Sequence, residues 1–495
     1  MNKFILILFL PFLFSKTVFA NSSTVSVSTF GIIPGKDCTD GFIKLNAWIE
    51  NKSDVTLLFS KGIYWVGRQK LSTTRVTENI DNILVLKNCS NIKLIGNGAT
   101  IKYNAKLKFG TFDIKTKLPL PRQKGFLKTE NAAWPGNCIL IHNAKQISIE
   151  NLTLDGNIQN MDIGGSYGDT GIQLWHRGIY LINSTQVTLT KLNIHHFGLD
   201  GIEISNGAIV QKQPKHEILL KNVKCLYNGR QGLSWTGGEG LTVLNSEFSH
   251  TGKSVLASSP GCGLDIEPET GECMNGRFVN CKFENNTGYA YGSEHFKLKI
   301  SDIRFDNCIF GGSTYGALFP NNGGVEITNS TIYGQIIRPG GVSATLRVVI
   351  KNSKLYDYNP YTNAALKFAT NHLVDAGSHE SFFDFINCEF YLSKVKLCYI
   401  ETGLNANSDA PIFRNNKINF NYTSFTKNDF IALFRGCILE NNSFIIKSNS
   451  SWVNGHFLLA QGTMNKGTNR IQAGNSNIGW NKASGVTELP LSENK

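Results

Sequence analysis

Four carboxylic acids in the middle of the chain have the clearest potential for chemistry: Asp200, Glu203, Asp265 and Glu267. They lie in or beside short segments that alternate apolar residues after a glycine. Aligning four such segments on that glycine places alternate side chains on opposite faces of a strand: GIYLI (178–182), GIEIS (201–205), GLSWT (232–236) and GLDIE (263–267). Glu203 and Asp265 then share one outward column, and Glu267 lies in the next.

This spacing predicts acid–base chemistry by paired carboxyl groups. Asp265 and Glu267 would lie about 6.5–7 Å apart along one strand, and Glu203 about 9.5 Å from Asp265 across two coils. Inverting glycoside hydrolases hold two carboxyl groups about 6.5–9.5 Å apart, which leaves room for a water molecule. Burial or mutual repulsion would raise the pKa of one carboxyl group and make it the proton donor.

Four further residues are candidates for substrate binding: Arg230, Gln231, Trp235 and His196. Arg230 can bind a carboxylate through two parallel hydrogen bonds. Trp235 would stack on a sugar if it faced outward, although the alignment places it inward. No spacing of His or Cys predicts a metal site, so no metal ligands and no cofactor are expected. A lyase would instead need a base and a cation, for which Arg230 with His196 or Tyr180 with Arg177 would serve, and Ca²⁺ would then be possible.

A repeat indicates how these residues are positioned. Alternating apolar residues, a polar turn and a second short strand recur every 22 to 35 residues, with one step of 40. Such a period predicts a solenoid whose coils bury their faces only by stacking. The turn position holds Asn in most units, and its amide can bond the units above and below: Asn151, Lys191, Asn222, Asn245, Asn280, Asn307, Asn329, Asn352 and Asn387.

The ends of the chain differ from this repeat. Residues 1–20 have a Lys, a long apolar run and a small residue at the end, which predicts a cleaved secretory signal. Residues 21–70 contain an amphipathic stripe behind Thr39 and Asp40, so we expect a helix that caps the open end of the solenoid. The coils would span 71–400, interrupted by a basic loop at 103–137, and 401–495 would hold the final coils and a C-terminal cap.

Composition limits the classes of function. The 495 residues are 41% hydrophobic and 17% charged, which excludes intrinsic disorder. The formal net charge of +12 favours an acidic partner such as an anionic polysaccharide. No apolar run after residue 20 is long enough to span a bilayer, and no nucleic-acid-binding motif is present. The eleven cysteines are too few to form the framework, although Cys262 and Cys273 are close enough in sequence to pair.

Several segments resemble the right-handed parallel β-helix, pectate-lyase-like superfamily. They include FGIIPGKDCTDGFIKLNAWI near the N-terminus, NIKLIGNGATI (91–101), LTLDGN (152–157) and NGRQGLSWTGGEGLTVLNSEFSHTG (228–252). The resemblance covers roughly residues 28–400. It implies an all-β fold, a single-stranded right-handed parallel β-helix with an N-terminal capping helix. The Asn-Thr-Asp, Asp-Asp and Gly-His-Gly pattern of polygalacturonases and the calcium carboxylates of pectate lyases are both missing.

We therefore expect a secreted or periplasmic enzyme that cleaves an acidic polysaccharide, with a glycoside hydrolase slightly favoured over a polysaccharide lyase. The alternatives are a uronan epimerase and a non-catalytic polysaccharide-binding adhesin. An enzyme requires converging ionisable groups, whereas a binding protein requires only aromatic or basic surfaces. The oligomeric state stays open.

Overall fold

A computed structural model describes most of the chain. The described residues are 23–78, 82–122, 128–168, 170–207, 215–294, 298–312, 315–321, 323–341, 343–361, 366–377, 382–401, 409–422, 432–448, 458–461, 463–467 and 469–473. The predicted signal (1–20) and much of the predicted C-terminal cap (401–495) lie outside them. None of the helices in these ranges has the length and apolar character that a membrane-spanning segment needs.

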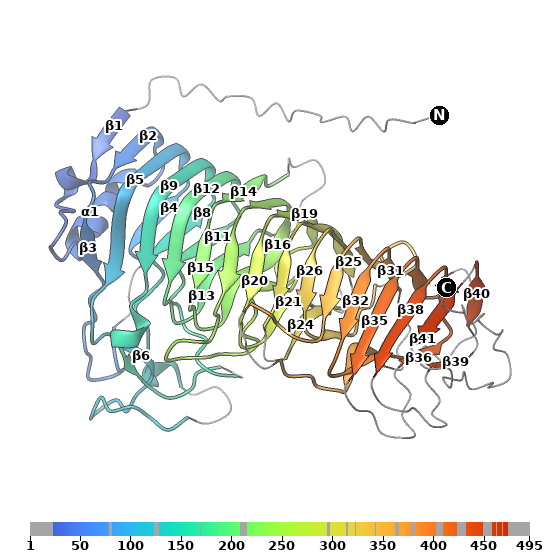
Figure 1. Ribbon diagram of the computed structural model, residues 1–495. Coiled ribbons are helices and arrows are strands. Elements are labelled where there is room, and N and C mark those ends of the chain that lie inside the picture. Colours follow the sequence, from blue (N-terminus) through green and yellow to red (C-terminus); the bar gives the residue numbers. More distant parts are fainter. Residues whose placement is uncertain are drawn as a thin grey trace.

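The chain forms a long parallel β-helix, as the repeat predicts (Figure 1). Each coil hydrogen-bonds in parallel to the coils before and after it, so equivalent strands stack into three faces. Face 1 contains β4 (Leu84–Lys87), β8 (Ile139–His142), β11 (Ile179–Ile182), β13 (Asp200–Ser205), the first part of β16 (Gln231–Leu244), β18 (Leu264–Ile266), β21 (Tyr289–Ser293), β24 (Gly316–Pro320), β27 (Ile336–Ile337), β30 (His372–Gly377), β33 (Lys396–Glu401), β36 (Ala432–Arg435) and β39 (Leu458–Gln461).

Faces 2 and 3 follow face 1 in each coil, and three long strands run through both. Face 2 contains β1 (Ser23–Ser26), β2 (Ser53–Leu58), the first parts of β5 (Ser90–Tyr103), β9 (Lys145–Asp155) and β12 (Thr185–His195), then β14 (Ile218–Lys221), the end of β16, β19 (Cys273–Val279), β22 (Ile300–Asp306), β25 (Gly323–Thr328), β28 (Val348–Lys351), β31 (Phe383–Ile386), β34 (Ile412–Arg414), β37 (Ile438–Glu440) and β40 (Met464–Lys466). Face 3 contains β3 (Ile63–Val66), the ends of β5, β9 and β12, then β15 (Lys224–Leu226), β17 (Glu247–Ser249), β20 (Lys282–Glu284), β23 (Ile309–Gly311), β26 (Thr331–Tyr333), β29 (Lys354–Tyr356), β32 (Glu389–Leu392), β35 (Lys417–Tyr422), β38 (Ser443–Ser448) and β41 (Arg470–Ala473).

The predicted capping helix is present as α1 (Thr39–Ile49), beside the short 3₁₀ helix η1 (Val27–Phe30), at the N-terminal end of the stack (Figure 1). Its stripe of Phe42, Leu45 and Ile49 is buried on the first coil. Asn46 also closes the open edge of face 1, because its amide donates to the Ile83 carbonyl at 2.9 Å and accepts from the Val85 N–H at 2.9 Å. An exposed strand edge is an aggregation hazard, so α1 protects as well as packs.

The repeated Asn residues turn the chain between faces 2 and 3. They adopt left-handed backbone angles, for example φ 55° at Asn280 and 52° at Asn307, a region that Asn tolerates better than most residues. Their exposed amides form a ladder between coils: Asn280 donates to Asn245 at 3.0 Å, and Asn307 donates to Asn280 at 2.7 Å. The predicted structural role of these residues is confirmed.

The interior is filled by apolar side chains stacked from coil to coil. Phe278 lies 4.7 Å from Phe305, and Phe283 lies 5.2 Å from Phe310, each pair nearly parallel. All eleven cysteines are buried and free. The possible pairing of Cys262 with Cys273 is therefore wrong: the two thiols belong to different faces, one before β18 and one at the start of β19.

The basic segment 103–137 leaves the coil and folds back onto the next one. Its strands β6 (Lys108–Thr111) and β7 (Ala132–Ala133) join β10 (Asp162–Ile163) in a small three-stranded sheet. Two 3₁₀ turns, η2 (Thr129–Asn131) and η3 (Ile158–Asn160), flank this sheet. Its exposed cations include Lys106, Lys115, Arg122 and Lys128.

The turn ladder yields a stability test at Asn280. Asn280→Gly keeps the left-handed backbone accessible and removes the amide, whereas Asn280→Val also introduces a β-branched residue that disfavours this backbone. We expect the Val variant to be less stable than the Gly variant by about 1–2 kcal/mol. Urea unfolding followed by circular dichroism measures this difference, and equal stability of the two variants would show that the turn geometry is not limiting.

Candidate active site

The predicted outward column on face 1 is confirmed by the strand register. Tyr180 pairs with Glu203, Glu203 with Ser234, and Ser234 with Asp265. Glu203 and Asp265 are thus two coils apart, which corresponds to about 9.6 Å between their backbones. A bulge in β16 shifts the pairing after Ile204, so Ser205 faces Gly237 rather than Thr236. The second predicted column is interrupted there.

Two arginines hold the carboxylates at the start of this column. Arg230 donates to both oxygens of Asp200, from Nε at 2.9 Å and from Nη2 at 2.7 Å. Arg177 donates from Nε to Oε2 of Glu203 and lies 3.7 Å from Oδ2 of Asp200. Asp200 is fully buried and Glu203 is 6% exposed. Such a buried network fixes the position of Glu203, because each charge has a partner.

Asp265 is held differently, by a neutral amide. The backbone N–H of Cys262 donates to Oε1 of Gln231 at 2.8 Å, which orients the amide so that Nε2 donates to Oδ2 of Asp265 at 2.6 Å. The other oxygen, Oδ1, faces the position of Gly292 in the next coil, where an added Cβ would lie 3.6 Å away. A proton on Asp265 would therefore reside on Oδ1, beside a residue that has no side chain.

Burial raises the pKa of both carboxyl groups, but nearby charges act on the two groups differently. Burial, together with the nearby charge of Glu267, raises the pKa of Asp265 to about 8. Burial also raises the pKa of Glu203, but the Arg177 and Arg230 guanidinium groups oppose this shift. For Arg230, ion pairing with Asp200 outweighs burial and raises its pKa. At neutral pH Asp265 is consequently protonated, as a proton donor must be.

Glu267 lies just past the end of β18 and is exposed. Its charge contributes to the raised pKa of Asp265, and its predicted part as a catalytic carboxyl group stays a prediction. Of the four predicted catalytic residues, Asp200, Glu203 and Asp265 are connected through Arg230, whose pKa responds to all three.

Aromatic side chains flank the carboxyl groups along the same column. Tyr180 lies on one side, with the Arg177 guanidinium 4.5 Å from its ring. On the other side, beyond Gly292, Phe319 continues the column and stacks on Tyr289 at 5.1 Å. Tyr315, 57% exposed, lies 6.3 Å from Tyr289. Flat rings beside carboxyl groups suit the apolar faces of sugar rings.

Loops between faces 3 and 1 surround the start of the column. Trp175 is 53% exposed and meets Trp134 edge to face at 6.4 Å. The N–H of Ser258 donates to the Gly229 carbonyl, directly before Arg230, and Ser258 also bonds Ile172. Three excursions from the coil, including the basic segment, therefore meet beside Arg177 and Arg230.

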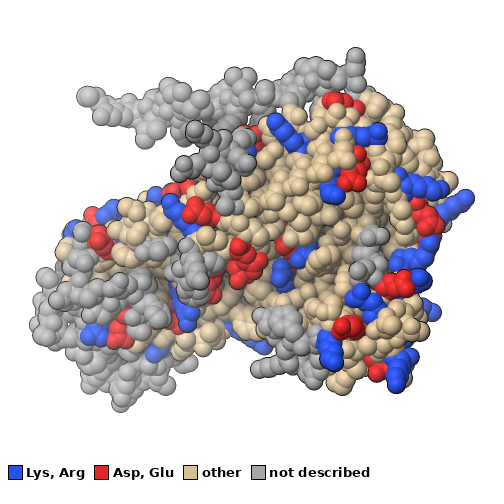
Figure 2. All heavy atoms as spheres, turned by 180° about the vertical axis from the view of Figure 1, so that it is seen from behind, with Lys and Arg blue, Asp and Glu red and all other residues tan. Residues whose placement is uncertain are grey.

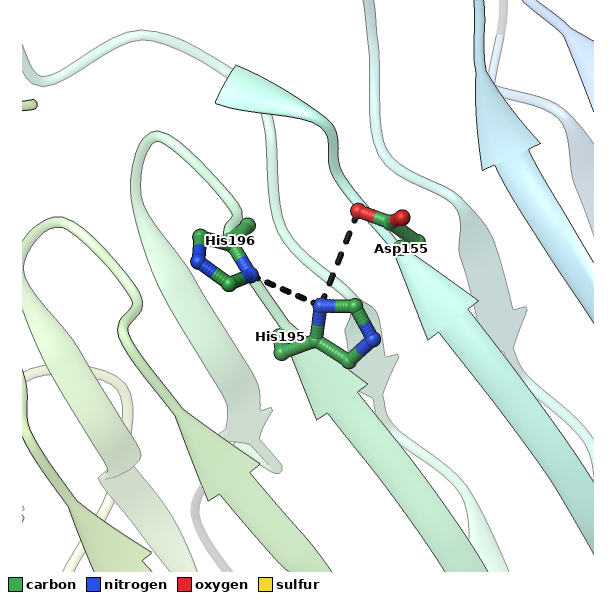
Figure 3. A group of neighbouring side chains, drawn as sticks. All are labelled: Asp155, His195 and His196. Carbon is green, nitrogen blue, oxygen red and sulfur yellow. Dashed lines mark hydrogen bonds and ion pairs between the residues drawn. The ribbon is translucent and has the colours of Figure 1, made fainter. Parts of the chain in front are cut away.

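Two predicted substrate-binding residues lie elsewhere. Trp235 is 1% exposed, and its indole N–H donates to the Gly237 carbonyl, so it is a core residue and the prediction of a binding role is wrong. His196 meets His195 and Asp155 at the end of face 3 (Figure 3). Arg230 and Gln231, by contrast, contact the predicted acids directly.

Sequence reasoning missed two contributors to the carboxyl column, Arg177 and Gly292, and one member of the histidine cluster, Asp155. Arg177 appeared only in the lyase alternative, although it precedes the aligned Gly178 just as Gln231 precedes Gly232. Gly292 lies in GYAYGSEH, which departs from the aligned pattern, so its place beside Asp265 was not visible. Asp155 ends LTLD, and only the pairing of β9 with β12 brings it to His195.

The face of the molecule in Figure 2 carries Lys and Arg side by side with Asp and Glu, and several acidic side chains gather near its middle. The positive net charge is therefore not concentrated into a continuous basic surface on this face. Exposed acids near the column include Glu267 and Glu269, both of which raise the pKa of Asp265.

Comparison with known proteins supports the architecture. Residues 137–332 match the family described as "Right handed beta helix region", which includes the whole column from Tyr180 to Phe319. No curated protein matches the sequence. Among solved structures, a mannuronan C-5 epimerase A-module from Azotobacter vinelandii is similar at 14% identity and TM-score 0.37, covering 89% of this chain and 98% of that one.

Two further similar structures are an exopolygalacturonase and an alpha-1,3-glucanase. An exopolygalacturonase from Thermotoga maritima has 10% identity and TM-score 0.29, with coverage of 89% of this chain and 92% of that one. An alpha-1,3-glucanase from Streptomyces thermodiastaticus has 11% identity and TM-score 0.33, with coverage of 93% and 70%. At these values no activity is carried over to this chain.

The raised pKa of Asp265 predicts a stability effect. The folded protein keeps the Asp265 proton up to a pH of about 8, whereas an unfolded Asp loses it near pH ~3.9. Stability contributed by this residue therefore falls as the pH rises between these values. Asp265→Asn, which keeps the acceptor for Gln231, should be more stable than the native protein at pH 8 by about 1 kcal/mol or more.

The measurement is urea unfolding of both proteins at pH 4.5 and pH ~8. The stability difference should shrink at the lower pH, where the native side chain is also neutral. An Asn variant that is less stable at both values would contradict a protonated Asp265.

Proposed function

Since the chain is a right-handed β-helix protein, we propose that it cleaves a polysaccharide, acting as an inverting glycoside hydrolase with Asp265 as acid and Glu203 as base. One observation carries the proposal: the two carboxyl groups share an outward column two coils apart, one bonded to a neutral amide and the other to a guanidinium. The backbones that carry them are about 9.6 Å apart, close to the upper end of the carboxyl spacing of about 6.5–9.5 Å that admits a water molecule in inverting enzymes.

The reaction assigns a distinct task to each group. Asp265 donates its Oδ1 proton to the glycosidic oxygen as the bond to the anomeric carbon breaks. Glu203 accepts a proton from the water molecule that attacks the same carbon from the opposite side. The balance is one water consumed and one new reducing end, and a proton then returns from Glu203 to Asp265 through solvent.

Asp200 and Arg230 act as positioning residues. Asp200 is fully buried, so it does not reach a substrate, but its bidentate pair with Arg230 places this guanidinium between Glu203 and Asp265. Arg177 serves Glu203 in the same way. The two cations favour the ionised form of Glu203, as a base requires.

The substrate would lie along the helix axis. Tyr180 and Phe319 are at the two ends of a column that spans five coil steps, about 24 Å, which accommodates several sugar units. The exposed cations of the basic segment favour an acidic polysaccharide, whereas Glu267 and Glu269 favour a neutral sugar next to Asp265. We propose an acidic polymer with the cleaved bond beside a sugar of low charge. Secretion or a periplasmic location belongs to the same proposal.

In the first experiment the protein is incubated with a panel of acidic and neutral polysaccharides, and both new reducing ends and ultraviolet absorbance are measured. New reducing ends without ultraviolet absorbance would support the hydrolase. Absorbance of an unsaturated uronate would replace it with a lyase, and an isomerised polymer with unchanged length would replace it with an epimerase. Binding without any chemical change would support the adhesin.

Substitution of the two carboxyl groups is the sharper test. Asp265→Asn and Glu203→Gln should each lower kcat by about 10²–10⁴-fold, the usual contribution of acid–base catalysis. The matched control is Asp384→Asn, because Asp384 is also buried and bidentate with an arginine, Arg347, at 2.6 and 2.8 Å on face 2. Equal losses in all three variants would mean that stability, not catalysis, is being measured.

The pH profile provides an independent check. The acid must be protonated, so kcat/KM should fall above a pH of about 8, the pKa of Asp265. In Asp265→Asn the residual activity should lose this alkaline limb. A limb that persists in the variant would assign the acid to another residue.

A further inference from the structure

Three side chains with metal-binding atoms converge at the outer end of face 3, away from the carboxyl column. Asp155 ends β9 and His195 ends β12, and these two residues are paired across the coils. His196 follows directly. One ligand atom from each of Asp155, His195 and His196 lies within 4.8 Å of the others (Figure 3). Parallel stacking therefore gathers residues that are 40 positions apart in the sequence.

Each side chain is held in place by a separate contact. Lys102 binds Oδ2 of Asp155 at 2.8 Å, and the Asn157 N–H donates to Oδ1 at 2.9 Å, so Oδ1 is fixed on the side of His195. His196 has φ 58°, a left-handed angle that turns its ring back toward His195. Its other side stacks on Tyr227 at 5.3 Å. The cluster is thus preorganised by neighbours that would orient metal ligands.

The contact between the two histidines is unusual. Their Nδ1 atoms lie 2.8 Å apart, and Nδ1 of His195 is 3.6 Å from Oδ1 of Asp155. Two ring nitrogens at this distance require a proton or a cation between their lone pairs. Ligands around a tetrahedral zinc, at about 2.0–2.1 Å from the metal, are separated by about 3.3 Å, and the two observed distances bracket this value.

The three side chains lie in a partly covered site: Asp155 is buried, and His195 and His196 are half-buried. Asp155 and His195 are 8% and 21% exposed at the side chain, so the cluster keeps some contact with solvent.

We propose that Asp155, His195 and His196 bind a zinc ion through Oδ1 and two Nδ1 atoms, with water as the fourth ligand. Two imidazoles and one carboxylate favour zinc over calcium or magnesium, which prefer oxygen ligands alone. The ion would link two adjacent coils. It would lie at the start of the turn that leads from His196 to Asp200, so its binding would stiffen the segment that precedes Asp200.

The test uses the folded full chain, because an unfolded chain would bind zinc through its eleven thiols. Zinc is removed with a chelator, and calorimetric titration with zinc alone should give one site per chain. Asp155→Asn and His195→Gln should weaken binding by at least about tenfold, and His250→Gln is the matched control. His250 stacks on the same Tyr227, at 4.7 Å, but contacts neither Asp155 nor His195.

Two more readouts separate a metal ligand from a merely structural residue. Cobalt should bind at the same site with the visible bands of a tetrahedral ion, and Asp155→Asn should abolish them. Lys102→Met should tighten zinc binding, because it removes a competing cation from Asp155. Circular dichroism of each metal-free variant confirms that it is folded.

Three results would contradict the zinc site. No stoichiometric zinc in the native chain, or equal zinc binding by all variants, would overturn the proposal, and equal loss in His250→Gln would do the same. Because the readout is binding rather than turnover, none of these results depends on whether Asp265 and Glu203 cleave a polysaccharide.

Discussion

Parallel hydrogen bonding between successive coils is the constraint on which the rest of the structure depends. It fixes the spacing of neighbouring backbones at about 4.8 Å and, away from bulges such as the one after Ile204, places each residue over its equivalent in the next coil. The same rule stacks Phe278 on Phe305 in the core, joins Asn245 to Asn280 at the turn and places Glu203 two steps from Asp265 along face 1.

Because register is set by repetition, much of the site could be predicted from the sequence. The glycine before each strand of face 1 was sufficient to align Tyr180, Glu203, Ser234 and Asp265 correctly, and the inward pattern correctly placed Ile202 and Leu233 in the core. The apolar stripe after Asp40 likewise predicted α1. Each of these patterns is local in the sequence, and the repeating coil determines where its residues lie in the fold.

The remainder could not be predicted because it depends on side-chain direction and on the loops between coils. The bulge after Ile204 has no composition signal, and it displaced the second column. His195 and His196 were judged by sequence spacing, although their partner Asp155 belongs to the previous coil. For Trp235 the alignment correctly predicted an inward side chain. The expected sugar contact was based only on the residue type, and it was wrong.

The placement of Ser234 between Glu203 and Asp265 has a consequence for how such a scaffold could change. Deleting the one coil that carries Ser234 would leave the core continuous, yet it would bring the two carboxyl-bearing backbones to within about 4.8 Å. That is close to the spacing of about 5–5.5 Å at which the second carboxylate attacks the sugar itself and the anomeric configuration is kept. If the proposed hydrolase reaction holds, gain or loss of one repeat would be a mutational route between inversion and retention of the anomeric configuration.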